Sequence, residues 1–480
     1  MTSTRLLAVV ALLGLASCGS RSSLIGGGPA GADGGAGSTP AGGAGGGGSG
    51  GGGLPVCHLD LASPPSIPLH SFPEGGADSP ALVVLHPGAA EGPSGPEVAR
   101  VASQARSNDA NFWHPELRIA ELAIDLPWPD GVSVTHAPTL AGIDSHGWGR
   151  LAAGANGGLA LFWHRGDEAA GFPTGIKLRS FDTTSWGSGG ETFIDPEGYT
   201  PHEIRPAKLD GTASGPPGYI ASWTRWNAVS ALVAYVAVFD AAGSFTMGPV
   251  AVGAEEDSPR TFADVIWTGE THLVAVGATV CQEGGPPCSP GAMNILRLVP
   301  GSPMGDAGVE LVASIPLVSP EAFPRRPSFA RTGNSLWVTW SEVDGAVEPP
   351  TRRMRIARLD PAGNVVGTPE TLADGAAAGT SMISTGTESD LLIAWGEIVD
   401  ESLPPGQVGH SRVVVHHRDT EGKEIDAPIH VDTASFANQA SLSIVGLQRP
   451  RAFLVTWAAY REDGLEEITY LSRLDCSDTD

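Results

Sequence analysis

The stretch LDPAGNVVGTP, residues 359–369, decides the fold: Asp360 and Gly363 stand three residues apart and Pro369 follows. The same D-x-x-G-x5-P spacing returns at residues 240–249 and 419–428. Fainter copies place an aspartate at 125, 182 and 475, and Val299 takes its place in one copy. The intervals between these seven positions are 57, 58, 59, 61, 59 and 56 residues. A fixed period of this length indicates a repeat architecture.

A second marker lies upstream of most of these positions, as a short apolar segment that ends in tryptophan. The five copies are Leu159–Trp163, Tyr219–Trp223, Leu336–Trp340, Leu391–Trp395 and Phe453–Trp457. Each repeat is typical of four short strands separated by Gly, Pro and Asp turns, with no helical periodicity. The sequence therefore predicts an all-β protein, with the recurring tryptophan in the core between neighbouring units.

Seven units of four strands resemble a seven-bladed β-propeller over residues 54–480. The repeats lie near 79–135, 136–197, 198–256, 257–318, 319–375, 376–436 and 437–480, the last together with 57–70. Aspartate accepts backbone N–H bonds within a tight turn, and glycine takes the positive φ that the turn needs. We expect the recurring proline on the outermost strand, where a missing N–H costs little.

The last repeat ends without a fourth strand, whereas Pro64–His70 precedes the first repeat and has no repeat of its own. We expect this segment to supply the missing outer strand and so to close the ring. Two of the five cysteines, Cys57 and Cys476, flank this closure and are a candidate disulfide pair. Cys281 and Cys288 are a second candidate pair, within one hairpin loop.

The N-terminus reads as an export signal. Arg5 precedes the apolar run Leu6–Leu15, which is too short to span a bilayer. The following Leu-Ala-Ser-Cys, residues 15–18, resembles the lipobox of bacterial lipoproteins. The resemblance implies a signal peptide over 1–17, a lipid on Cys18 and, since Gly19 follows, the outer membrane. Residues 18–53 are then a lipidated cysteine and a disordered glycine-rich tether.

Composition limits the partners. The net charge is −25, with 28 Lys and Arg against 53 Asp and Glu. This balance excludes nucleic acid, whose phosphates need clustered cations, and it excludes a polybasic membrane patch. We therefore expect membrane contact through the Cys18 lipid alone, for a monomeric propeller that faces the periplasm or the cell exterior.

Candidate binding residues gather in the long loops between the second and third strands of the repeats. They are acidic: Glu342, Asp344, Asp400, Glu401, Asp463 and Glu466. A ring of carboxylates is chemically able to hold Ca²⁺ or a basic partner. The alternative is a solvated face on a protein that is acidic throughout. His416 and His417 are adjacent on a strand, so they point to opposite faces and make a poor chelate.

Two functions from different classes fit these observations. The first is a non-catalytic binding or scaffold protein for an envelope protein or a glycan, with no cofactor. The alternative is an envelope hydrolase or lyase acting on carbohydrate. No catalytic residue and no metal-ligand set stands out in the sequence, and the fold alone allows either function.

Overall fold

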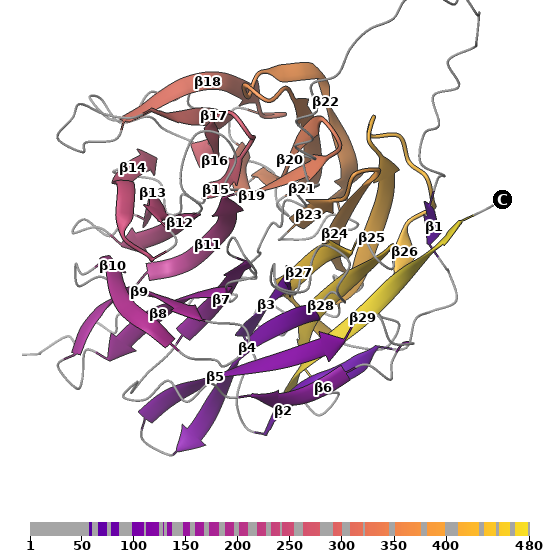
Figure 1. The fold of residues 1–480 in the computed structure, drawn as a ribbon. Coiled ribbons are helices and arrows are strands. Elements are labelled where there is room, and N and C mark those ends of the chain that lie inside the picture. The colour runs from indigo at the N-terminus through magenta and orange to yellow at the C-terminus, as the bar shows by residue number, and fades with distance from the viewer. Residues whose placement is uncertain are drawn as a thin grey trace, which may run out of the picture.

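The computed structural model describes residues 57–59, 66–73, 78–85, 98–109, 112–123, 128, 132–136, 147–153, 159–167, 172–181, 188–195, 201–209, 218–226, 232–240, 242–253, 263–278, 291–299, 308–319, 322–344, 351–375, 382–398, 411–431, 436–447, 451–460 and 466–478. All of the long elements in these ranges are β-strands (Figure 1). In this part of the chain, no helix has the length and apolar character needed to cross a membrane. The predicted signal peptide, Cys18 and the tether lie outside the described residues.

The strands form six four-stranded antiparallel sheets and one five-stranded sheet, numbered I to VII in chain order. Sheet I contains β3 (Asp78–Leu85), β4 (Val98–Asp109), β5 (Phe112–Ala123) and β6 (Val132–His136). Sheet II contains β7 (Gly147–Ala153), β8 (Leu159–Asp167), β9 (Phe172–Phe181) and β10 (Ser188–Asp195). Sheet III contains β11 (Pro201–Leu209), β12 (Gly218–Trp226), β13 (Leu232–Asp240) and β14 (Phe245–Gly253).

The remaining sheets follow the same order. Sheet IV contains β15 (Ala263–Trp267), β16 (His272–Ala278), β17 (Ala292–Val299) and β18 (Gly308–Pro316). Sheet V contains β19 (Ala322–Thr332), β20 (Ser335–Asp344), β21 (Thr351–Leu359) and β22 (Val365–Asp374). Sheet VI contains β23 (Met382–Gly386), β24 (Asp390–Ile398), β25 (Ser411–Asp419) and β26 (Ile429–His430). Sheet VII contains β27 (Phe436–Leu447), β28 (Ala452–Tyr460) and β29 (Glu466–Asp478), with β1 (Cys57–Leu59) and β2 (Ile67–Pro73) on β29.

The first strand of each sheet is its innermost strand. These inner strands contact one another in the order β3, β7, β11, β15, β19, β23 and β27, and β27 in turn contacts β3. Figure 1 shows the sheets radiating from this common axis. The chain is therefore an all-β propeller, as the sequence predicts.

Two N-terminal segments pair with β29, the strand before the C-terminus. Ile67–Pro73 pairs with residues 466–471, and Cys57–Leu59 pairs with residues 476–478. The outer-strand segment expected from sequence was Pro64–His70, three residues earlier than β2, and β1 was not expected as a strand. Both segments fit along β29 because this strand is 13 residues long.

The turn between the third and fourth strands has the predicted chemistry. In sheet V the Asp360 carboxylate accepts the N–H of Asn364 at 2.8 Å, and Gly363 donates its N–H to the Asp360 carbonyl at 2.9 Å. Burial raises the pKa of Asp360, but hydrogen bonds from Asn364, Ala362 and Gly363 outweigh it and lower that pKa overall. Gly363 has a φ of 94°. Sheets III and VI repeat the turn at Asp240–Gly243 and Asp419–Gly422. The prediction for this motif is confirmed.

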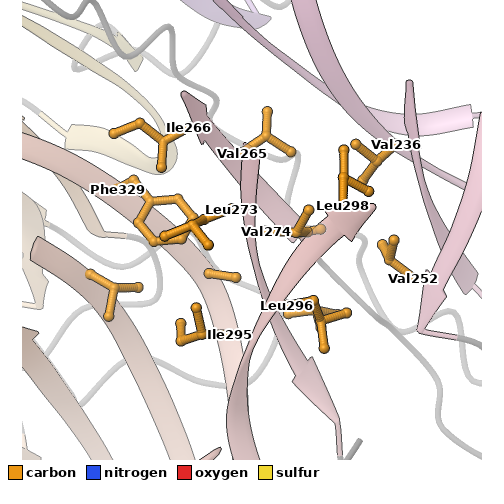
Figure 2. Close-up of a cluster of buried hydrophobic side chains, with 14 of the residues drawn as sticks. Val236, Val252, Val265, Ile266, Leu273, Val274, Ile295, Leu296, Leu298 and Phe329 are labelled. Carbon is orange, nitrogen blue, oxygen red and sulfur yellow. The ribbon is translucent and has the colours of Figure 1, made fainter. Parts of the chain in front are cut away.

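The core lies between neighbouring sheets. One cluster joins sheets III, IV and V through side chains such as Val236, Val274 and Phe329 (Figure 2). Others join II to III, V to VI, VI to VII and VII back to I. The predicted core tryptophans include the largest fully buried side chains, namely Trp223, Trp340, Trp395 and Trp457. This prediction is confirmed where the side chains are described.

Candidate functional site

The inner strand of sheet V contains a bulge with unusual backbone geometry. Arg325 pairs with Ser341 and Ser328 pairs with Thr339, so Arg326 and Pro327 together oppose one residue of β20. Arg326 has a φ of 46°, the one positive φ at a non-glycine residue in the described chain. Arg326 is 7% exposed. Buried residues with a strained backbone of this kind occur more often at ligand-binding sites and active sites than elsewhere.

Glu342 lies near this bulge, because it pairs with Pro324 of β19. Its carboxylate accepts the Trp340 Nε1–H at 2.9 Å and an Arg355 Nη1–H at 3.1 Å. The other carboxylate oxygen accepts the N–H of Val318 at 3.2 Å, in the connection from sheet IV to sheet V. Glu342 is 1% exposed. Glu342 is therefore ion-paired with Arg355, and its hydrogen bond from Val318 fixes the connection from sheet IV to sheet V.

Asp344 is the last residue of β20 and pairs with Ala322, the first residue of β19. It follows Glu342 by two residues, so both carboxylates lie on the same face of sheet V. Asp344 is 9% exposed. Its position at the end of the strand makes it the more accessible of the two acids from the loop side.

The neighbouring sheet approaches closely at the same place. A Cβ built on Gly277, near the end of β16, would lie 2.5 Å from the Pro324 side chain and 2.9 Å from its carbonyl oxygen. Only glycine allows this contact without displacement of β19. The segment that follows β16 contains the candidate pair Cys281 and Cys288, which lies outside the described residues.

The predicted acidic ring is only partly described, and its described members differ from the prediction. Glu342 and Asp344 were expected in an exposed loop, but they belong to β20 and are buried. The reason is that β20 and β21 stay paired as far as Asp344 and Thr351, which places Arg355 within reach of Glu342. Asp400, Glu401 and Asp463 lie outside the described residues. Glu466 begins β29, and its side chain is not described.

Sequence reasoning did not single out Arg326 or Arg355. The available signal was the density of arginine: 7 of the 25 arginines lie between residues 325 and 358 of a chain with net charge −25. Arg325 also lies 4.8 Å from the centre of the Phe323 ring. In the described part of the chain no group of three or more His, Cys, Asp or Glu side chains is arranged to hold a metal ion.

The adjacent histidines separate as predicted. His416 stacks on Trp395 with ring centroids 4.4 Å apart. His417 points to the other side of sheet VI, toward Asp390 and Asp426. Burial lowers the pKa of His416 to about 4, and the nearby Arg418 acts in the same direction.

No family model matches the chain, and no curated protein matches it. Solved structures of similar shape include a protein of unknown function from Dyadobacter fermentans, with 12% identity over 86% of this chain and 99% of that one and a TM-score of 0.44. An α-L-arabinofuranosidase from Fusarium graminearum has 12% identity over 69% and 93%, with a TM-score of 0.45. An α-L-arabinanase from Penicillium chrysogenum has 9% identity over the same shares, with a TM-score of 0.45. At these scores the similarity carries no conclusion about activity.

Proposed function

We propose that the protein is a lipid-anchored envelope propeller that acts on carbohydrate, with its glycan bound beside the bulge of β19. The observation that carries the proposal is the buried Arg326 with its positive φ in the bulge of β19, two residues from the position that pairs with Glu342 and four from the position that pairs with Asp344. The scaffold hypothesis depended on exposed acids at this face, and two of the six, Glu342 and Asp344, are buried. The carbohydrate-active alternative is therefore the one we retain.

The ligand class follows from the donors and acceptors at the site. Arginine offers only donors, whereas an ionised carboxylate offers only acceptors. A ligand that contacts both kinds of group must present donors and acceptors together, and every sugar hydroxyl does so. A polyhydroxylated ligand fits this combination better than a purely cationic one does.

Cleavage of a glycosidic bond needs a carboxyl group that transfers a proton or activates water. Asp344 is the candidate, because it is the last residue of β20 and lies on the loop side of Glu342. Glu342 then acts as a positioning residue that fixes the loop next to the glycan.

The test is a glycan-binding array, followed by measurement of released reducing ends on any glycan that binds. Asp344→Asn is expected to abolish release and to retain binding, whereas Arg326→Ala is expected to weaken binding about tenfold or more. Asp374→Asn is the matched control, because Asp374 lies on β22, the outermost strand of the same sheet, where it pairs with Arg353 of β21. Absence of glycan binding contradicts the proposal, and so does release that survives in Asp344→Asn.

The proposal also includes the anchor. Leu15–Cys18 supports lipidation at Cys18, and residues 19–53 would hold the propeller off the membrane. Membrane fractionation of the full chain against Cys18→Ser tests this step. We expect the variant to leave the membrane fraction. Equal membrane retention of the two proteins excludes a Cys18 anchor.

A seven-bladed ring closed by the N-terminal strand and a Cys57–Cys476 disulfide completes the proposal. The backbone pairing of Leu59 with Cys476 places Cys57 two residues away along the opposing strand. Non-reducing peptide mapping is expected to recover the pairs 57–476 and 281–288. A 57–281 pair would contradict this closure.

A further inference from the structure

The boundary between sheets VII and I, where the last sheet of the ring meets the first, contains two buried threonine hydroxyls. Thr456 of β28 and Thr469 of β29 are both 0% exposed. Neither Oγ1 atom has a hydrogen-bond partner in the described part of the chain. Buried hydroxyls in proteins are mostly hydrogen-bonded, because removal from water without a replacement bond is costly. A hydrogen-bond partner for these two groups is therefore expected at this boundary.

Both hydroxyls lie on the face of sheet VII that covers sheet I. Successive side chains of a strand point to opposite faces, so residues two apart share a face. Thr456 is two residues from Leu454, and Thr469 is two residues from Leu471. Both leucines belong to the apolar cluster that joins sheet VII to sheet I. The two threonines therefore interrupt an otherwise apolar contact between the last and the first sheet.

The repeat position of Thr456 makes a direct polar link at two other boundaries. Thr456 directly precedes the repeat tryptophan of its sheet, as Ser222 does in sheet III and Thr339 does in sheet V. Ser222 donates to the Ala263 carbonyl of sheet IV at 2.9 Å, and Thr339 donates to Ser384 Oγ of sheet VI at 3.2 Å. Each hydroxyl thus reaches the inner strand of the next sheet. Thr456 occupies the position for such a link to sheet I, but among the described residues it has no direct partner.

The pairing register brings the two hydroxyls close to each other. Thr456 pairs with Leu471 and Thr469 pairs with Ala458, so the two threonines are diagonal neighbours on one face. The Cα atoms of such neighbours are about 7–8 Å apart, and their Cβ atoms are somewhat closer. Two hydrogen bonds of about 2.8 Å allow one water molecule to span roughly 5–6 Å between two oxygens. We propose that a buried water molecule bridges Thr456 and Thr469 and links sheet VII to sheet I.

The surroundings provide space and a further partner for this water. Three alanines at 0% exposure line this boundary, namely Ala458 in sheet VII and Ala99 and Ala120 in sheet I, and their small side chains fill less of it than larger apolar residues would. A buried water makes about three hydrogen bonds. Strand β3, the inner strand of sheet I, contacts β28. We expect a backbone carbonyl of β3 as the third partner, because Ser222 also uses a carbonyl of an inner strand.

A crystal structure of the full chain, at a resolution that shows ordered water, tests the site directly. We expect one water oxygen within about 2.7–3.2 Å of both Oγ1 atoms. A boundary without this water overturns the proposal. A direct hydrogen bond from either hydroxyl to a protein group, in place of the water, overturns it as well.

A double-mutant cycle in denaturant unfolding tests the bridge in solution. Thr456→Val and Thr469→Val each retain the side-chain shape and remove one hydroxyl. Each is expected to raise the unfolding equilibrium constant about tenfold, because the remaining hydroxyl loses its partner. The double variant should be about as unstable as either single one, since no hydroxyl is then left without a partner. Two unbridged hydroxyls predict the opposite, namely neutral or stabilising effects that add, and this result overturns the proposal.

Thr339→Val is the matched control, because its hydroxyl bonds directly to protein groups of sheets V and VI. It should be destabilising by a similar factor, but its effect should add to that of Thr469→Val, because the two residues are in different boundaries. Thr456→Ser keeps the hydroxyl, so Thr469→Val should still be destabilising in that background and nearly without effect in the Thr456→Val background. Equal effects of Thr469→Val in the two backgrounds exclude the water bridge.

Discussion

Replacing Trp395 with alanine tests whether the repeat tryptophan is the packing element between sheets V and VI. Trp395 is 2% exposed and packs with Met382, Ile393 and Val414. Truncation of a fully buried tryptophan costs about 3–5 kcal/mol. Its stacking on His416, with centroids 4.4 Å apart, places the expected loss in the upper half of that range.

The assay is equilibrium denaturant unfolding of the wild type, Trp395→Ala and Trp395→Phe. The phenylalanine variant retains a ring and should lose roughly half as much stability. A second readout is the pH dependence of stability, because opening the site should return the pKa of His416 from about 4 toward 6.5. A loss under about 1 kcal/mol in Trp395→Ala refutes the reasoning, since that value is typical of a surface site.

Three further outcomes follow from other contacts. Burial lowers the pKa of His272 to about 4 from 6.5. The stability that its neutral ring provides is therefore complete above pH 6.5 and decreases toward pH 4, by at most about 3 kcal/mol. In His272→Gln, unfolding measured over the same acid range should not show this decrease in stability. Gly422→Ala should lower thermal stability more than Gly367→Ala does. Both glycines have positive φ, but a Cβ at 422 would lie 2.4 Å from a carbon of the Trp337 ring in the neighbouring sheet, whereas the space at 367 is open. Equal losses of stability would contradict this contact. Arg451→Ala should cost several kcal/mol, because it removes the guanidinium that binds the buried Asp390 carboxylate. Arg358→Ala, whose acidic partner is 68% exposed, should cost under about 1 kcal/mol in the same denaturant assay.

Local chemistry explains which parts of the fold could be predicted from sequence. The turn at Asp360–Gly363 depends on residues within five positions, so its spacing alone predicts it. The buried tryptophans were predictable for the same reason, since they mark the ends of short apolar segments. Strand β2 was placed three residues too early, because the register of β2 is set by its partner β29 and not by its own sequence.

The candidate site could not be predicted because its determinants are distant in sequence. The bulge at Arg326 exists only relative to the opposing strand, where one residue faces two. Glu342 looks like a loop acid until β21 places Arg355 beside it, 13 residues later. The connection that donates the Val318 N–H to Glu342 is more distant still, at 24 residues. A buried, paired glutamate and a solvated one therefore look the same in the sequence.

These contacts suggest why an acidic propeller buries some of its polar groups between sheets. Apolar burial is non-directional, so it holds neighbouring sheets together without fixing their relative position. Hydrogen bonds across the boundaries supply direction. Asp264 of β15 accepts the Phe329 N–H of β19 at 2.7 Å, and Ser222 of β12 donates to the Ala263 carbonyl of β15 at 2.9 Å. Because each such bond joins two sheets at a defined register, the polar groups specify the ring geometry that the hydrophobic clusters stabilise.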